Sequence, residues 1–327
     1  MSVTPVNLDA VRTAREHIAS HIRPTPLMRH PLLDDETGFE LWIKHENHNP
    51  TGAFKVRGGL NLVSTLSADE RARGVVTAST GNHGQSIGMA CRLRGIACTV
   101  FVPLGNNPIK NAAMRAFGAT VEEVGRDFDE AREACERRAA ETGARYVHSA
   151  NEPHLIAGVG TYALEVFEGL SDIDVVYVAI GGGSGACGLI TVRNALSPQT
   201  KIIGVGAANA DAVHCSWRGP ERVVGTSAAT FAEGVATRVT FDYTFDMLKQ
   251  YLDDFVLLTE DELAEGVRLA IRTTRNLAEA AGAASLMAAH KFRDQHRGQR
   301  VVAIMSGGNL DMERLAVIAA GTTPAAP

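Results

Sequence analysis

The stretch Ala179–Ile190, AIGGGSGACGLI, joins the end of an apolar run to a glycine-rich loop that opens a helix. Gly183, Gly185 and Gly188 spell G-x-G-x-x-G, which binds the pyrophosphate of a dinucleotide when it follows a strand and precedes a helix. Residues 181–185 also form a plain phosphate cradle, in which the N–H groups at a helix N-terminus bind one anion. The stretch therefore predicts the strand, loop and helix of an α/β protein, and it leaves two classes of cofactor open.

The rest of the chain repeats this alternation of strand and helix. A first amphipathic helix is expected over 8–22, and further helical patterns cover 127–143 and 260–278. Strand-like runs are FELWIKHE (39–46), GVVTAST (74–80), CTVFVP (98–103), TVEEV (120–124), YVHS (146–149), VVYVAI (175–180), KIIGVGA (201–207), FVLLT (255–259) and RVVAIMS (300–306). Repeated β-α-β units predict mostly parallel, doubly wound sheets covered by helices on both faces. Ligands of such folds bind at the carboxyl ends of strands, so the loops that follow strands are the places to look for a site.

Composition excludes several classes of function. The chain has 327 residues, 45% of them hydrophobic and 21% charged, which is typical of a globular protein. The net charge of -5 and the lack of a basic cluster argue against nucleic acid as a partner. No run of about 18 apolar residues predicts a membrane span. The five cysteines fit no metal-ligand spacing, and the N-terminal stretch has no signal-peptide pattern, so a cytoplasmic protein is expected.

Four unusual loops follow predicted strands. One is the glycine loop, and another is ENHNPTGAFKVRGG (46–59). Here Lys55 stands at the expected start of a helix, behind the turn 49–52 and next to Phe54. A lysine in a first helical turn is usually a solvated side chain. Lysine is nevertheless disfavoured at the positive end of a helix. A partly desolvated lysine there has a lowered pKa, and its neutral amine can form a Schiff base.

The two remaining loops are STGNHGQSIG (79–88) and MSGGNL (305–310). In the first, hydroxyl and amide groups meet a helix N-terminus, a combination that suits a carboxylate or phosphate, although such a sequence is more often a simple turn and helix cap. His83 taken alone reads as a structural histidine. In the second, Ser306 ends an apolar strand and two glycines follow, which equally fits a helix cap.

Taken together and in this order, NPTGAFKVRGG, STGNHGQSIG, GGGSGACG and SGGN resemble the fold-type II pyridoxal phosphate enzymes, the tryptophan synthase β-like family. The resemblance covers nearly the whole chain. It is strongest to the serine/threonine dehydratase group, which carries T-G-S/A-F-K-x-R-G and S-x-G-N-H. Val56 after the lysine and His83 after the asparagine differ from the cysteine synthase pattern. Val56 also differs from the threonine synthase pattern, which is the weaker exclusion.

This resemblance implies two lobes with the cofactor held by the larger one. The large lobe is expected at 1–65 and 150–327, and the small lobe, with the substrate-carboxylate loop, at 66–149. Lys55 is implied as the catalytic residue that carries pyridoxal phosphate. The resemblance further implies three sets of residues: cofactor-binding Phe54, Lys55, Asn82, Gly181, Gly182, Gly183, Ser184, Gly185 and Ser306; substrate-binding Ser79, Thr80, Gly81, Asn82 and His83; and Glu279 as a further candidate that equally fits a solvated helix face.

The implied reaction is elimination of water from a 3-hydroxy amino acid, giving a 2-oxo acid and ammonia. Threonine or serine is the default substrate, and phenylserine and 3-hydroxyaspartate stay open. A homodimer is usual in the family. The segment after KIIGVGA offers Asp211 but places Gly206 and Ala212 where metal-binding relatives have acids, so no divalent metal is expected.

Other readings stay open at this point. One is another fold-type II lyase or a racemase, although Thr80 stands where serine racemases have a second serine. The other is a nicotinamide-dependent oxidoreductase that uses the G-x-G-x-x-G at 183–188. That reading needs an acidic residue about 20 positions on to bind the ribose. The strand KIIGVGA ends in Gly206 and Ala207 instead, which favours pyridoxal phosphate.

Overall fold

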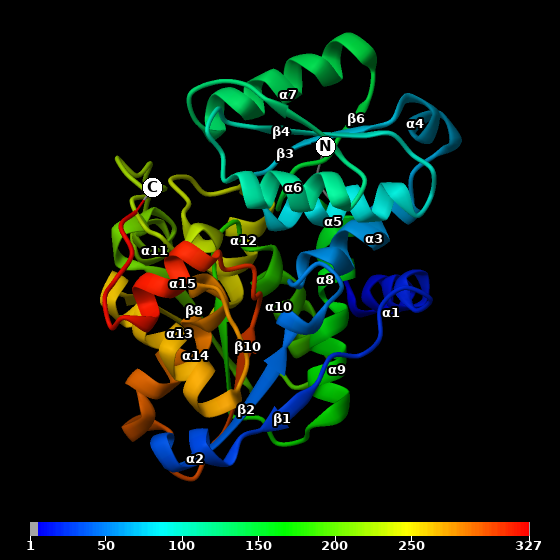
Figure 1. Ribbon diagram of the computed structural model, residues 1–327. Helices are drawn as coiled ribbons and strands as arrows, with labels where there is room; N and C mark the ends of the chain where they lie inside the picture. The colour runs from blue at the N-terminus through cyan, green and yellow to red at the C-terminus, as the bar shows by residue number, and fades with distance from the viewer. Residues whose placement is uncertain (1–5, 327) are drawn as a thin grey trace. The chain divides into compact units, whose positions relative to one another are not determined.

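The computed structural model describes residues 6–326 of the chain. They form two compact units, each built around its own sheet of mostly parallel strands (Figure 1). The first unit contains residues up to Arg23 together with Lys55–Thr161, and the second contains Pro24–Phe54 and the chain from Tyr162 onward. The α/β class with doubly wound, mostly parallel sheets is confirmed.

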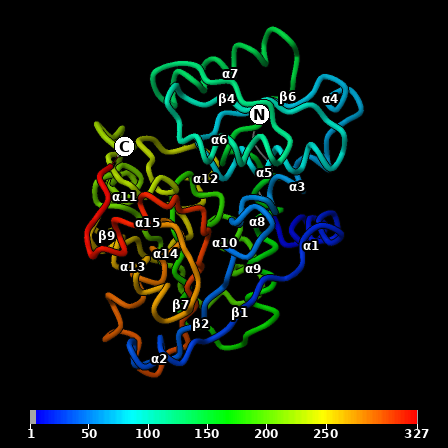
Figure 2. The backbone as a smooth tube through the Cα atoms, in the orientation of Figure 1, coloured from blue at the N-terminus to red at the C-terminus, as the bar shows by residue number. Residues whose placement is uncertain are grey.

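The first unit has four parallel strands in the order β5-β4-β3-β6. These strands are β3 (Val75–Ala78), β4 (Cys98–Val102), β5 (Thr120–Glu123) and β6 (Arg145–Tyr146). Its helices are α1 (Leu8–Ile18), α3 (Lys55–Ser64), α4 (Ala68–Arg73), α5 (Asn82–Arg92), α6 (Pro108–Ala116), α7 (Phe128–Thr142) and α8 (Pro153–Val159). Helix α1 packs against α3 and α8 and lies beside α8 in Figure 2. The unit contains the segment up to Arg23, 55–65 and 150–161 together with 66–149, so its bounds differ from those of the predicted small lobe.

The second unit has six strands in the order β1-β2-β10-β7-β8-β9. They are β1 (Leu27–Arg29), β2 (Glu40–His45), β7 (Val175–Ala179), β8 (Lys201–Ala207), β9 (Asp254–Leu258) and β10 (Arg300–Met305). All are parallel to their neighbours except β1, which is antiparallel to β2. Strands β2 and β10, from opposite ends of the chain, lie side by side in the middle of this unit (Figure 1).

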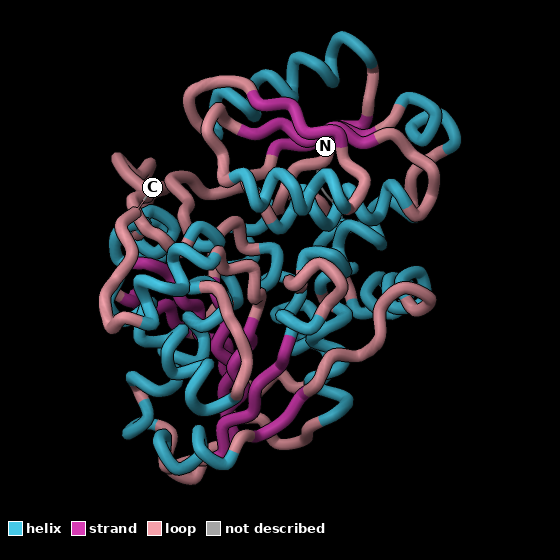
Figure 3. The backbone as a smooth tube through the Cα atoms, viewed as in Figure 1, coloured by secondary structure: helices cyan, strands magenta, loops and turns pink. Residues whose placement is uncertain are grey.

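Helices and short 3-10 turns cover this sheet, as the cyan segments around the magenta strands of Figure 3 show. The helices are α2 (Pro31–Thr37), α9 (Thr161–Gly169), α10 (Ser184–Leu196), α11 (Ala212–Arg218), α12 (Asp242–Tyr251), α13 (Glu260–Thr274), α14 (Ala280–Lys291) and α15 (Met312–Ala319). The 3-10 turns are η1 (Glu46–His48), η2 (Ala208–Ala210), η3 (Glu233–Val235) and η4 (Arg293–Gln295).

Local sequence signals explain where several helices begin and end. Helix α13 starts at a capping box, in which the Thr259 hydroxyl accepts from the N–H of Glu262 and the Glu262 side chain accepts from the N–H of Thr259. Helix α7 starts behind Asp127 and stops at Gly143, whose φ of 70° an L side chain rarely adopts. Helix α7 lies where the periodicity predicts it, whereas α13 begins as predicted but ends at Thr274 instead of continuing to 278.

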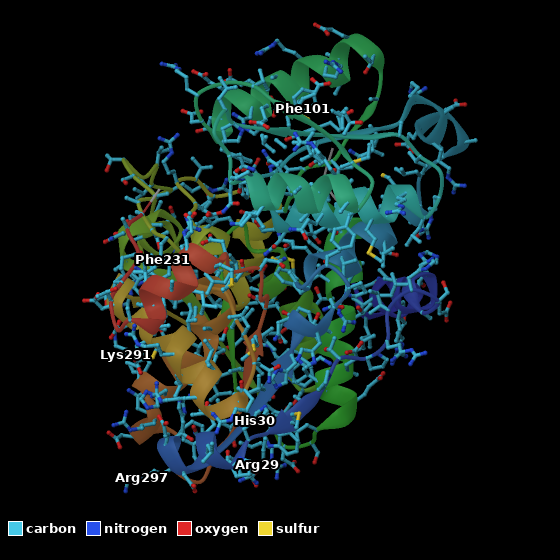
Figure 4. All side chains as sticks on the ribbon, viewed as in Figure 1. Arg29, His30, Phe101, Phe231, Lys291 and Arg297 are labelled. Carbon is cyan, nitrogen blue, oxygen red and sulfur yellow. The ribbon has the colours of Figure 1, made fainter. Side chains whose placement is uncertain are left out.

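Each unit has its own apolar core. Phe101 of β4 belongs to the core of the first unit, and Phe231 belongs to the core of the second (Figure 4). All nine predicted strands are present, but YVHS is strand only at Tyr146 and continues as a loop. Strand β1 was not predicted, because it has three residues on a half-exposed edge. Within residues 6–326, no helix is long and apolar enough to cross a membrane.

Candidate active site

Lys55 is the first residue of α3, as the sequence predicts. The turn before it closes with a hydrogen bond of 2.8 Å from the N–H of Gly52 to the carbonyl of Asn49. Gly52 has a φ of 68°, and a side chain there would also collide with the Asn309 side chain. The amide of Asn309 donates to the Thr51 carbonyl at 2.8 Å. Asn309 of the SGGN loop therefore supports the turn that leads to Lys55.

The same two loops pair as a short antiparallel bridge. Ala53 bridges Gly307, the N–H of Phe54 donates to the carbonyl of Ser306 at 3.0 Å, and the N–H of Gly308 donates to the carbonyl of Gly52 at 2.8 Å. Ser306 is half-buried, and its hydroxyl makes a long hydrogen bond of 3.4 Å to the carbonyl of Ala281. The second unit thus holds the residue before Lys55 and the predicted ring-facing serine in one backbone structure.

The glycine loop follows β7 and opens α10, the predicted strand, loop and helix. Gly183 is the N-cap residue with a φ of 89°, and α10 has no side-chain cap. A side chain at Gly181 would overlap the carbonyl oxygen of Gly234, while Gly185 has the Phe54 ring in ordinary contact, 3.4 Å from where a Cβ would stand. A 13-residue helix that begins with backbone N–H groups and small residues fits a phosphate. The loop therefore fits the phosphate of pyridoxal phosphate.

Glu279 is placed next to Ser306 through Gly307. Its N–H donates to the carbonyl of Gly307 at 3.1 Å, and its carboxylate occupies the space that a Gly307 side chain would need. Glu279 is the N-cap residue of α14 and is half-buried, so it is not a solvated helix-face residue. The second unit thus assembles Phe54, Ser306, Glu279 and the glycine loop.

The loop STGNHG lies in the first unit, between β3 and α5. The hydroxyl oxygen of Ser79 accepts hydrogen bonds from the N–H of Gly81 (3.1 Å) and of Gly84 (2.9 Å). With its lone pairs used in this way, the hydroxyl is left to donate its hydrogen, which a carboxylate accepts well. Asn82 is the first residue of α5, whose N-terminus carries positive partial charge. This geometry fits a site for a carboxylate.

His83 is buried and uses its ring in a different way. The Thr77 hydroxyl donates its single hydrogen to the carbonyl of Val147 at 2.7 Å. Its oxygen can therefore only accept from Nε2 of His83, which lies 2.9 Å away. Nε2 therefore carries the hydrogen, and Nδ1 is an acceptor with no hydrogen-bond partner among residues 6–326. Burial, with the charges of Lys55 and His148, lowers the pKa of His83 to about 3. An Nδ1 without a hydrogen cannot donate to a carboxylate, so only the backbone of His83 suits the predicted role in binding the substrate carboxylate.

Lys55 has the electrostatics that its predicted role needs. Its amine donates to the carbonyl of Ser149 at 3.1 Å, and burial lowers its pKa to about 8. Lys44, the fully buried lysine of β2, differs because its amine lies 2.5 Å from a carboxylate oxygen of Glu165. The lowered pKa of Lys55 leaves a larger share of its amine neutral, as a nucleophile and base must be.

Several residues that hydrogen-bond to the backbone of the glycine loop and of Lys55 were not predicted from the sequence. Thr244 donates to the carbonyl of Gly182 at 2.8 Å, and the Tyr162 hydroxyl donates to the carbonyl of Gly185 at 2.8 Å. The Ser86 hydroxyl donates to the carbonyl of Lys55 at 2.7 Å. The spacing of four positions between Asn82 and Ser86 in a predicted helix could have indicated Ser86 from the sequence. Thr244 and Tyr162 stand in segments with no motif.

The loop after β6 was also missed. It contains Ser149, whose carbonyl accepts from Lys55, and the neighbouring His148. Its predicted strand, YVHS, could have marked it as a fifth loop at the carboxyl end of a strand.

The family model described as pyridoxal-phosphate dependent enzyme matches residues 18–307. The L-threonine ammonia-lyase of Thermotoga maritima is 37% identical over 312 residues, which are 95% of this chain and 77% of that protein. The structure of threonine deaminase isoform 2 from Solanum lycopersicum superposes with a TM-score of 0.89 at 30% identity, covering 97% of this chain and 90% of that one. Maize serine racemase superposes with a TM-score of 0.91 at 27% identity, covering 96% of both chains.

Proposed function

The chain belongs to the pyridoxal-phosphate dependent enzyme family and is a lyase that uses this cofactor, and we propose that it eliminates water from threonine or serine. The observation that carries the proposal is Lys55, a lysine at a helix start whose pKa burial lowers to about 8. The products are the 2-oxo acid and ammonia. When bound, pyridoxal phosphate supplies an aldehyde for the amine, a ring that withdraws electrons from Cα, and a phosphate that titrates near neutral pH.

Lys55 performs two tasks in this proposal. Its neutral amine binds the aldehyde, and after release it takes the proton from Cα of the substrate. With a pKa of about 8, roughly a tenth of the amine is neutral one pH unit lower, whereas an ordinary lysine would be almost wholly charged. Burial of the amine therefore makes one residue able to act as nucleophile and base at neutral pH.

The other residues hold the reacting groups in place. The N–H groups of Gly181–Gly185 are proposed to bind the phosphate, with Phe54 packed on Gly185. The hydroxyl of Ser79 and the N-terminus of α5, with Thr80, Gly81, Asn82 and the backbone of His83, are proposed to bind the substrate carboxylate. Asn82 is also proposed to contact the cofactor.

Ser306 offers the ring nitrogen a hydroxyl. A hydroxyl, unlike a carboxylate, brings no negative charge to stabilise a protonated nitrogen, which favours prompt loss of the β-substituent over a long-lived carbanion. The carboxylate of Glu279 lies beside Gly307, the residue after Ser306, and we propose that it lies near the reacting amine.

Racemisation is a second candidate activity, favoured by the likeness to maize serine racemase. A racemase needs a second acid or base on the opposite face of Cα. Thr80 carries a hydroxyl in the carboxylate loop, but its methyl group restricts the rotamer. Elimination is therefore the main proposed activity.

The direct test records the visible spectrum of the purified protein while threonine, serine, phenylserine and 3-hydroxyaspartate are added in turn. A yellow protein that produces 2-oxo acid from one of them supports the proposal and identifies the substrate. A yellow protein that leaves all four unchanged would make it a binding protein. A colourless protein that changes the absorbance of an added nicotinamide dinucleotide would instead indicate an oxidoreductase.

Two further features concern the location and the assembly of the protein. All five cysteines are unpaired and four of them are buried, which suits the reducing cytoplasm. A homodimer is proposed because it is usual in the family, and sedimentation of the purified protein tests it.

A further inference from the structure

The loop 147–151 lies at the carboxyl end of β6, in the same unit as Lys55. It has no role in the reaction described above. The amine of Lys55 donates a hydrogen bond of 3.1 Å to the backbone carbonyl of Ser149. A backbone carbonyl has a fixed direction only if the peptide units around it are held, so the neighbours of Ser149 decide what this contact can do.

His148 holds the loop on one side. Its Nδ1 accepts from the N–H of Ala150 at 3.1 Å and of Asn151 at 2.9 Å. A ring nitrogen that accepts hydrogen bonds carries no proton, so His148 is neutral with its hydrogen on Nε2. Burial and the nearby charge of Lys55 lower its pKa to about 4, so this arrangement persists at neutral pH. The side chain of His148 thus closes a turn around the carbonyl of Ser149.

Thr77 and His83 hold the loop on the other side. The Thr77 hydroxyl donates to the carbonyl of Val147 at 2.7 Å, and it accepts from Nε2 of the buried His83. The backbone before Ser149 is therefore tied to buried side chains of β3 and α5, and the backbone after it is tied to the His148 side chain. The carbonyl is preorganised and does not depend on Lys55 for its position.

We propose that the carbonyl of Ser149 is the binding position of the Lys55 amine whenever that amine is not attached to the cofactor, and that His148 is the positioning residue that fixes it. The proposal rests on the proposed function, in which Lys55 is released before it acts as a base. A neutral amine that donates one N–H to this carbonyl keeps its lone pair for the proton of Cα. After it gains that proton, the same carbonyl stabilises the ammonium by a charge–dipole interaction.

A carbonyl suits this purpose better than a carboxylate. An adjacent carboxylate favours the charged lysine and typically shifts a pKa by about 1–3 units in that direction. The carbonyl brings only a dipole, so it sets the position of the nitrogen while burial still lowers the pKa to about 8. Lys44, paired with Glu165, shows the opposite arrangement within the same chain.

The contact itself can be observed in the protein without cofactor. The chain contains three Ser–Ala sequences, at 67–68, 149–150 and 227–228. Labelling serine with carbon-13 at the carbonyl and alanine with nitrogen-15 therefore gives three amide signals by NMR. We expect one carbonyl shift to titrate with a midpoint at about pH 8, and Lys55→Gln to abolish that titration. His83 and His148 titrate far lower, near 3 and 4, and do not interfere. If no signal depends on Lys55, the proposal is wrong.

The role of His148 is tested with a matched pair of variants. His148→Asn keeps an acceptor oxygen near the place of Nδ1, and His148→Ala removes the acceptor. With a substrate deuterated at Cα, we expect His148→Ala to lower kcat about 10- to 100-fold. Its isotope effect should rise, while KM and the visible spectrum of the resting protein stay the same. His148→Asn should restore most of the rate.

Two outcomes overturn the positioning role. One is a loss in His148→Ala that appears in KM, the resting spectrum and protein yield alike, because that indicates general damage to the fold. The other is an unchanged rate and isotope effect. Both results are distinct from failure of the proposed function, in which the unmodified protein makes no 2-oxo acid at all, and the NMR experiment needs no reaction.

Discussion

The backbone N–H of Phe54 donates a hydrogen bond of 3.0 Å to the carbonyl oxygen of Ser306. Phe54 immediately precedes Lys55, and Ser306 follows β10 at the far end of the sequence. The bond belongs to a bridge that also pairs Ala53 with Gly307. Phe54, the residue before Lys55, is thus fixed to the loop of Ser306, the residue that we propose faces the cofactor ring.

Lys55→Ala is expected to abolish the yellow absorbance and to lower elimination by several orders of magnitude, because attachment and proton abstraction use the same amine. The fold should persist, since removing a desolvated amine relieves a cost and does not create one. Borohydride reduction and peptide mapping provide the measurement. Lys201→Ala, at an exposed strand end, is the control. A pyridoxyl group on another lysine contradicts the assignment.

Uptake of pyridoxal phosphate by the protein without cofactor should accelerate as the pH rises and level off near pH 8. Only the neutral amine attacks an aldehyde, and burial lowers the pKa of Lys55 from 10.5 to about 8. Stopped-flow absorbance measures the rate, and free Nα-acetyl-lysine corrects for titration of the cofactor itself. A rate that keeps rising toward pH 10.5 would show that Lys55 has the pKa of an ordinary lysine.

Gly181→Ala is expected to weaken cofactor binding at least about tenfold, because its Cβ would overlap the carbonyl oxygen of Gly234 and force the loop to move. Gly185→Ala is the matched control in the same loop. Its Cβ would stand in ordinary contact with the Phe54 ring, at 3.4 Å, so a much smaller change is expected. Equilibrium titration with pyridoxal phosphate measures both. Equal effects would show that the loop does not bind the phosphate through the position of Gly181.

Elimination should be faster than racemisation by at least about tenfold, because the methyl group of Thr80 restricts the hydroxyl that a second acid–base residue would need. Thr80→Ser should reduce this ratio. Chiral chromatography of the amino acid, alongside an assay of the 2-oxo acid, measures it. Formation of D-amino acid as the faster reaction would identify the protein as a racemase.

Elimination is expected to survive EDTA. Gly206 and Ala212, on either side of η2, have no carboxylate, and a carboxylate oxygen of Asp211 already accepts from the Cys215 thiol at 3.3 Å. A divalent cation needs several oxygen ligands and usually carboxylate charge. The test compares activity before and after EDTA and after Mg²⁺ is returned. Loss of most activity with recovery in Mg²⁺ would reveal a site that these residues do not explain.

The sequence by itself determined the order of strands and helices and the loops worth examining. Apolar runs such as VVYVAI are long enough to predict buried parallel strands, and the glycine loop after it needs no distant partner to be recognised. The helix start at Lys55 follows from the turn before it, because glycine at position 52 and the helical pattern after it are local signals. These features depend on residues close together in the chain.

Only the tertiary structure decided which loops meet and what their atoms can donate or accept. The bridge between Ala53 and Gly307 depends on β2 and β10 lying side by side, a pairing that no local pattern encodes. The hydrogen on Nε2 of His83 is fixed by Thr77, whose own hydrogen is used by Val147. The lowered pKa of Lys55 depends on burial, and burial is a property of everything packed around a group. Periodicity locates a lysine at a helix start, but only the folded chain can remove water from its amine.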